Sequence, residues 1–200
     1  MDQEIEESIQ VKAVTKDEIL LAALKLFTSK GYFKTSLTDI AELLGLQNTS
    51  TIYHHFKDKQ MMATEIYINI FDSLSISIDE IRRKNQRSSE QLKSITELLF
   101  RLTDEAPDVI RFLFVLKLDE FLPDEKPALE TAAFVKVFKI IQSGIRNGEI
   151  RDIDPQLINA YFFGVITHTL CSVLTGVLSK KADAYLNQSW SAAWQTIAKK

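Results

Sequence analysis

Side chains suited to polar recognition gather between residues 49 and 59. Three consecutive hydroxyl residues are followed by a tyrosine, two histidines and a lysine, all of which can donate hydrogen bonds. Hydroxyls bond base edges, a threonine methyl packs against thymine, and a lysine holds a phosphate. A nucleic-acid contact surface needs this chemistry, and a merely solvated helix face is the alternative interpretation. The residues are Thr49, Ser50, Thr51, Tyr53, His54, His55 and Lys59.

Two short helices joined by a tight turn are predicted to position these side chains. Ser36 can cap the first helix, in which apolar residues recur at helical spacing up to a terminating glycine. Asn48 can cap a second helix over residues 49–56, in which Ile52 and Phe56 lie four apart and face inward. The remaining polar residues then point outward. This arrangement is a helix-turn-helix whose second helix is presented to solvent.

The same stretch resembles the signature of the TetR family of bacterial transcriptional regulators. The matching residues occur in order, with a turn one residue longer than the commonest pattern. They are Gly31, Tyr32, Thr35, Ser36, Asp39, Ile40, Ala41, Gly45, Leu46, Tyr53, His55, Phe56 and Lys59. The resemblance implies that Thr35 and Ser36 join the seven residues above in contacting DNA. It also implies that Lys59 and the start of the following helix hold a phosphate.

Charge is distributed unevenly along the 200 residues. The net charge of −3 argues by itself against a nucleic-acid binder. Residues 11–60, however, contain seven lysines and five acidic residues, a surplus of two positive charges. No arginine precedes Arg82, so the bidentate arginine–guanine contact is unavailable here. We therefore expect DNA affinity to fall with salt less steeply than it does for arginine-rich proteins.

Composition favours a soluble, cytoplasmic protein without a membrane partner. Hydrophobic residues make up 46% and charged residues 26%, and apolar runs stop short of the ~20 residues that a membrane span needs. Acidic residues follow Met1, unlike a secretory signal. The single Cys171 cannot form an internal disulfide, and we expect it to be buried rather than to act as a redox sensor.

The rest of the chain is also predicted to be helical, giving about nine helices in all. Thr15 and Glu18 form a capping box that opens a helix to about residue 30. A long helix is predicted over 59–84, because apolar residues recur every four positions, although residues 73–78 alternate like a strand. Further helices are predicted from Ser89, which would cap its own helix, and over 108–122, 128–146, 155–178 and 182–199.

The predicted fold is therefore all-α and divides into three parts. They are a mobile tail at 1–14, a helix-turn-helix DNA-binding domain at 15–58, and a helical effector-binding and dimerisation domain at 59–200. Small residues such as Gly164 and Ala192 permit close helix approach in the last two helices. The resemblance implies that this pair forms a four-helix homodimer interface, and a two-fold dimer fits palindromic DNA.

A small-molecule site is expected in the carboxy-terminal part, because nine of the twelve phenylalanines follow Lys59. Such sites are apolar cavities with few polar groups. The candidate lining residues are Phe112, Leu116, Phe138 and Phe163, with His168 as a polar anchor. The alternative for His168 is a hydrogen-bonded histidine of the core or of an interface. The expected effector is a small apolar or aromatic molecule.

The residue pattern bears on three possible functions: a repressor, an enzyme and an interaction module. The resemblance implies a repressor that an effector releases from a palindromic operator by tilting the 59–84 helix. An enzyme is disfavoured, because no catalytic triad, phosphate loop or metal motif is present. Since His54 and His55 diverge by about 100° on a helix and lack a third ligand, no metal or cofactor is expected. A helical interaction module without specific DNA binding remains the alternative, which salt-dependent DNA affinity would exclude.

Overall fold

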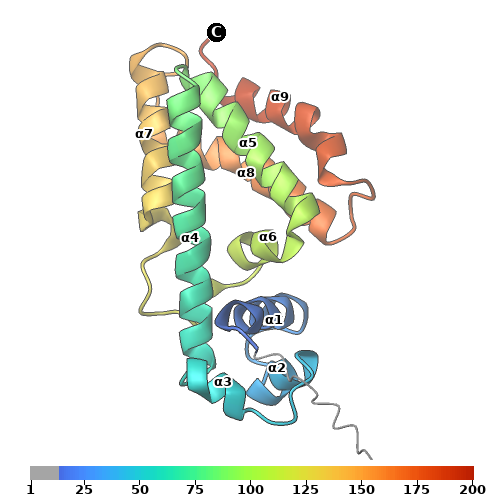
Figure 1. The fold of residues 1–200 in the computed structure, drawn as a ribbon. Helices are drawn as coiled ribbons and strands as arrows, with labels where there is room; N and C mark the ends of the chain where they lie inside the picture. Colours follow the sequence, from blue (N-terminus) through green and yellow to red (C-terminus); the bar gives the residue numbers. More distant parts are fainter. Residues whose placement is uncertain (1–13) are drawn as a thin grey trace, which may run out of the picture.

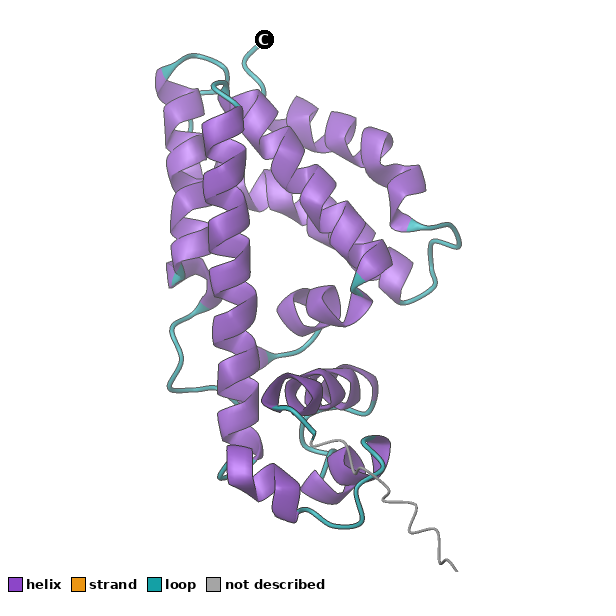
Figure 2. Cartoon of the chain, viewed as in Figure 1, coloured by secondary structure: helices purple, strands orange, loops and turns teal. Residues whose placement is uncertain are grey.

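The computed structural model describes residues 14–200, and its regular elements are all helices (Figures 1 and 2). In this part of the chain there are nine α-helices and three short 3-10 helices, so the predicted all-α class is confirmed. Of the predicted tail, residues 1–13 lie outside the described residues, while Val14 packs against the core. The α-helices are α1 (Lys16–Ser29), α2 (Leu37–Leu43), α3 (Ser50–His55), α4 (Lys59–Lys84), α5 (Ser88–Glu105), α6 (Pro107–Phe114), α7 (Ala132–Arg146), α8 (Pro155–Leu174) and α9 (Leu186–Ile197).

The first two helices begin at the predicted caps, Thr15 and Ser36, and both caps are capping boxes, of which only the first was predicted. The Thr15 hydroxyl accepts a hydrogen bond from the Glu18 amide at 3.2 Å, and the Glu18 carboxylate accepts one from the Thr15 amide at 2.8 Å. Ser36 and Asp39 repeat this exchange at 3.1 and 2.6 Å at the start of α2. Both amino ends are thereby fixed by residues within four positions of each other.

The third helix starts one residue later than predicted, at Ser50. The N-cap is Thr49, whose side chain makes no capping hydrogen bond, so the prediction of Asn48 as the N-cap is wrong. The Asn48 carboxamide oxygen, one residue earlier, accepts a hydrogen bond from the Ser50 amide at 2.9 Å. Ile52 and Phe56 are fully buried, as their four-residue spacing predicted. This burial fixes the face of α3 that points away from solvent.

Helix α4 runs unbroken for 26 residues from the end of α3 to the opposite end of the molecule (Figure 1). Asp58 caps it by accepting a hydrogen bond from the Met61 amide at 2.8 Å. Residues 73–78 are helical, as the four-residue spacing of their neighbours predicted. Helix α4 packs against α1 near its start and against α7 further along. One continuous helix therefore joins the helix-turn-helix to the carboxy-terminal helices.

The predicted helix over 108–122 is wrong beyond Phe114, where α6 ends. Residues 115–127 form a loop around the 3-10 helix Leu118–Glu120. Phe121 and Leu122 are buried and anchor this loop in the core. The apolar residues of 108–122 therefore belong partly to a buried helix face and partly to a loop whose Phe121 and Leu122 are buried in the core.

Other helix ends also differ from prediction. The predicted helix at 128–146 starts with the 3-10 helix Ala128–Glu130 and becomes α7 only at residue 132. Helix α8 ends at residue 174, shortly before Gly176, whose φ of 79° breaks the helix. The predicted helix at 182–199 opens with the 3-10 helix Ala182–Tyr185, and α9 follows it.

Helix α5 begins at Ser88 and is not capped by Ser89, contrary to prediction. The Glu149 carboxylate, from the turn between α7 and α8, accepts hydrogen bonds from the amides of Ser88 at 3.0 Å and Ser89 at 3.1 Å. The Ser89 hydroxyl donates to the same carboxylate at 2.6 Å. The cap is thus a tertiary contact about 60 residues distant, which local sequence patterns do not reveal.

Candidate nucleic-acid interface

Helix α3 lies at the end of the molecule remote from α9 (Figure 1). Tyr53 is 57% exposed, and Ser50, His54 and His55 are also exposed. Thr49 and Thr51 are half-buried at the helix start. The structure therefore brings the hydroxyl, phenol and imidazole groups singled out in the sequence onto one short helix with a solvent-facing surface.

The Lys59 amino group is engaged inside the protein. Its Nζ donates to the carbonyl oxygens of Tyr32 at 2.7 Å and Thr35 at 2.8 Å, and lies 4.2 Å from the centroid of the Tyr32 ring. Burial lowers the pKa of Lys59, while the negative charge of Asp39 acts in the opposite direction. Lys59 thus ties the loop between α1 and α2 to the start of α4, which leaves one N–H for any phosphate.

Thr35 is not placed as predicted. Its side chain is 2% exposed, and its hydroxyl bonds the carbonyl oxygens of Gly31 at 2.8 Å and Leu26 at 3.3 Å. The expected phosphate contact by this side chain is therefore wrong, because the hydroxyl points into the loop that it closes. Ser36 is exposed, but its hydroxyl is shared with Asp39 in the α2 capping box.

The predicted set omitted two lysines that flank α2 and α3. Lys34 lies just before the α2 cap and Lys57 lies between α3 and α4, and both are exposed. Neither forms a hydrogen bond or an ion pair with any residue that the structure describes. By contrast, Lys30 pairs with Asp39 at 2.6 Å. The sequence positions of the two lysines could have identified them, because each lysine adjoins one end of the helix-turn-helix.

The predicted effector-site residues do not converge on one cavity. Phe112 is fully buried in the core, and His168 is exposed on α8. Leu116 lines a surface hollow beside the loop after α6, because that helix ends before it. Phe138 lines a different hollow between α7 and α8, and Phe163 alone reaches the internal cavity.

The internal cavity lies among α4, α5, α6, α7 and α8 and has a volume of about 40 Å³. Every residue that lines it is apolar, and Ile78, Ile95, Phe134 and Val137 come from three of these helices. Its volume compares with the share of one water molecule in the liquid, roughly 30 Å³. A larger molecule must therefore displace side chains in order to enter.

Aromatic contacts connect the helix-turn-helix to the loop after α6. The Tyr32 ring stacks on Phe121 with centroids 4.2 Å apart and planes at 14°. Phe121 in turn meets the edge of Phe112 at 6.4 Å. Nearby, the Thr28 hydroxyl of α1 hydrogen-bonds Asp108 of α6 at 2.9 Å. A displacement of α6 or of the loop after it would therefore also displace α1 and the loop between α1 and α2, which Lys59 contacts.

Helix α8 is strongly apolar yet poorly covered. Within the described part of the chain it is the one helix long and apolar enough to cross a membrane, and 22% of its most apolar 18-residue window is buried. Its uncovered side carries Leu157, Tyr161, Gly164 and His168, at intervals of three or four residues. This spacing places all of them on one helix face.

Comparisons with known proteins cover both the helix-turn-helix and the whole fold. Residues 19–66 match the family model described as bacterial regulatory proteins, tetR family. The HTH-type transcriptional repressor KstR2 of Rhodococcus jostii is 25% identical over 151 residues, which is 73% of each chain. A TetR family transcription regulator from Marinobacter aquaeolei has a similar structure, with a TM-score of 0.75 at 19% identity over 92% of this chain and 95% of that one. The structure of FadR from Bacillus subtilis in complex with stearoyl-CoA is also similar, with a TM-score of 0.70 at 20% identity over 90% of this chain and 97% of that one.

Proposed function

The chain is a member of the TetR family of bacterial regulatory proteins, and from this premise we propose that it is a transcriptional repressor released from a palindromic operator by a small apolar or aromatic effector. In this proposal residues 15–58 bind DNA, and residues 59–200 bind the effector and form the homodimer. The observation that carries it is helix α3, whose exposed polar face is held outward by the buried Ile52 and Phe56.

The proposed docking places the start of α3 in the major groove. Ser50 and Thr51 then face base edges, while Tyr53 and His55 lie toward the sugar-phosphate backbone. Lys34 and Lys57 flank the helix-turn-helix and supply charges for phosphates on either side of the groove. Because no arginine is available, base discrimination rests on hydroxyl, methyl and ring contacts, each of which is weaker than a bidentate arginine–guanine pair.

The uncovered face of α8 is the proposed centre of the homodimer, together with α9, which packs beside it. Gly164 has no neighbouring heavy atom within 4 Å of where its Cβ would stand, so a partner helix can approach closely there. His168 on this face fits the interface alternative rather than the pocket anchor. A two-fold dimer places two copies of α3 on half-sites about 34 Å apart.

Effector binding is proposed to enlarge the internal cavity between α4 and α7. The cavity is small and wholly apolar, so an apolar ligand would separate the helices that line it. The structural similarity to FadR, which was solved with stearoyl-CoA, supports a ligand with an extended apolar part. Movement of α4 or α6 would reach α1 through the Tyr32–Phe121 stack, and the effector lowers DNA affinity by preferring the displaced state.

A regulator of this kind needs neither catalysis nor a membrane. We accordingly propose that the protein is a cytoplasmic non-enzyme, and its match to bacterial regulatory proteins supports this proposal.

The proposal is tested by selection from genomic DNA. Purified protein is mixed with fragmented DNA of its own genome at two salt concentrations, and the retained fragments are sequenced. Recovery of one or a few palindromes is expected, with lower yield at the higher salt concentration. If no sequence is enriched at either concentration, the repressor assignment fails and the interaction module takes its place.

A further inference from the structure

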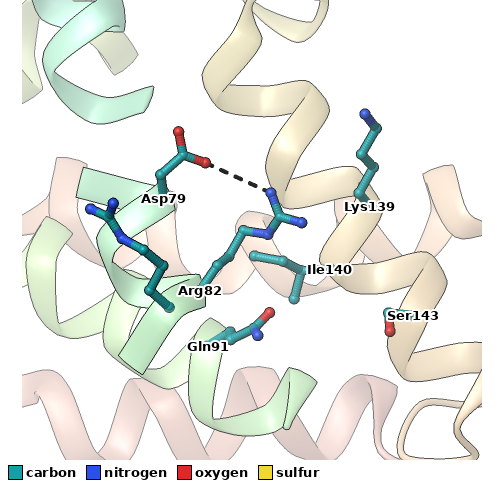
Figure 3. Close-up of a pocket in the computed structure, with 7 residues that line it drawn as sticks. Asp79, Arg82, Gln91, Lys139, Ile140 and Ser143 are labelled. Atoms are coloured by element: carbon teal, nitrogen blue, oxygen red, sulfur yellow. Dashed lines mark ion pairs between the residues drawn. The ribbon is translucent and has the colours of Figure 1, made fainter. Parts of the chain in front are cut away.

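A hollow lined by charged side chains lies at the end of α4 opposite to α3 (Figures 1 and 3). We call it the α4–α7 basic pocket. The last turns of α4, the first turn of α5 and the second half of α7 form its walls, and its volume is about 510 Å³. Ile140 is its apolar wall, and the polar lining consists of Asp79, Arg82, Arg83, Gln91, Lys139 and Ser143.

The lining carries three cations and one carboxylate, a net charge of +2, in a chain whose net charge is −3. The carboxylate of Asp79 is already engaged. It forms a short ion pair with Lys136, and its Oδ1 lies 3.7 Å from Arg82 Nη1 (Figure 3). The Lys136 hydrogen bond and, to a lesser degree, the charge of Arg83 lower the pKa of Asp79. The side chains of Arg83 and Lys139 form no hydrogen bond or ion pair with the described residues. The pocket therefore holds positive charge that the protein itself leaves uncompensated.

Neutral hydrogen-bond donors complete the lining. Gln91 donates one amide hydrogen to the Asn85 carbonyl at 2.8 Å, which orients its carboxamide and leaves the second hydrogen free. The Ser143 hydroxyl accepts a long contact from Asn147 at 3.4 Å and keeps its own proton to donate. Because these groups stand on three packed helices, the cations and donors are held around one space by rigid elements.

We propose that the α4–α7 basic pocket binds a small molecule bearing a di- or triphosphate group. Two or more negative charges match the net charge of the lining, and planar guanidinium groups bind phosphate oxygens through paired hydrogen bonds. The volume exceeds that of the phosphates and leaves room for an attached group such as a nucleoside. The hollow is bounded by three helices, is open to solvent on its remaining side and lies at the opposite end of α4 from α3, so it suits a compact ligand rather than a nucleic-acid strand.

Calorimetric titration of the full chain with inorganic tripolyphosphate, ATP and AMP at low salt tests this site. Tripolyphosphate and ATP are expected to bind, and AMP to bind at least about tenfold more weakly, because a single phosphate group presents its oxygens to fewer of the guanidinium and ammonium groups that line the pocket. Equal affinity for the first two ligands assigns recognition to the phosphate chain, and tighter binding of ATP adds the nucleoside. The absence of saturable binding by either triphosphate would overturn the proposal.

Two double variants of equal charge locate the site. Arg83→Gln with Lys139→Gln is expected to weaken triphosphate binding about tenfold or more, since each removed cation loses a charge-assisted hydrogen bond at a partly exposed position. Lys34→Gln with Lys57→Gln, which removes the same charge beside α3, is expected to leave the affinity within about twofold. Loss of binding in the second variant but not in the first would place the anion on the DNA-facing surface and contradict the inference.

Discussion

At the scale of single residues, the lysines near α2 and α3 differ in what their amino groups contact. Lys59 is bound to two carbonyl oxygens, whereas Lys34 and Lys57 are exposed and make no such contact with the described residues. The three lysines therefore have different roles although they carry the same charge. Lys59 stabilises the unit, and the two exposed lysines are available to phosphates.

Replacement of Lys34 and Lys57 by Gln is predicted to weaken DNA binding without changing its sequence preference. Each lysine that neutralises a phosphate adds close to one unit to the slope of log K against log salt concentration. Because the proposed homodimer carries two copies of each lysine, the slope should become shallower by about 4. Fluorescence anisotropy with one duplex at several salt concentrations measures this slope. An unchanged slope would show that neither lysine contacts DNA.

Lys59→Gln is predicted to lower the free energy of unfolding by about 1–3 kcal/mol, because the carbonyl groups of Tyr32 and Thr35 lose a charged donor. Urea denaturation followed by circular dichroism measures the loss. Lys57→Gln is the matched control and should change stability by less than about 0.5 kcal/mol. Equal stability of the two variants would refute the structural role of Lys59.

At the scale of the helices, the cap of α5 depends on a side chain from the turn between α7 and α8. Burial alone would raise the pKa of Glu149, but hydrogen bonds from Ser89 and Ser88 outweigh it and lower the pKa below its ordinary value. Arg87, with Nε 3.6 Å from the carboxylate, acts in the same direction. The ionised carboxylate thus links the start of α5 to the end of α7.

Glu149→Gln is predicted to destabilise the protein by about 1–3 kcal/mol at neutral pH, because a charged acceptor for three hydrogen bonds becomes neutral. The folded-state pKa is below the unfolded value, so the carboxylate's stabilisation is complete above the unfolded pKa and is lost as pH falls through the folded pKa. The difference between wild type and variant should therefore shrink in acid. Glu97→Gln, at an exposed pair with Lys93, is the control and should have little effect.

Local patterns predicted the helix starts whose caps are adjacent in sequence. Thr15 and Ser36 cap the helices that follow them, as expected. The α5 cap was missed because its partner is about 60 residues away. The predicted pocket residues do not line one cavity, because the lining depends on how each helix is rotated against its neighbours, and the sequence pattern does not specify that rotation. Leu116 illustrates this, since α6 ends before reaching it.

At the scale of the whole molecule, two surfaces must act together for palindromic DNA to be recognised. One is the exposed side of α3, and the other is the uncovered face of α8. The two helices lie in opposite halves of the molecule (Figure 1). The long α4 connects them without a flexible linker. The spacing of the two reading helices in a dimer therefore depends on the angle of α4.

Gly164→Glu is predicted to yield a folded monomer. An added side chain meets no heavy atom within 4 Å in the single chain, but a charge at this position would be buried against a partner helix. Sedimentation velocity measures the change in mass, and circular dichroism confirms the fold. Ile76→Glu is the control, because Ile76 is also exposed to solvent, at 62%, but lies on α4. A dimeric Gly164→Glu variant would refute the proposed interface.

The most direct test of the central claim is the equilibrium affinity for a recovered palindrome, measured beside a scrambled duplex of equal length for wild type and Tyr53→Ala. Wild type is predicted to bind the palindrome at least about a thousandfold more tightly than the scrambled duplex. Tyr53→Ala should lose affinity for the palindrome while its fold and dimer remain intact, because the Tyr53 side chain is exposed and supports no core contact. Equal affinity of wild type for both duplexes, or an unchanged affinity of Tyr53→Ala, would contradict the assignment of α3 as the helix that binds the operator.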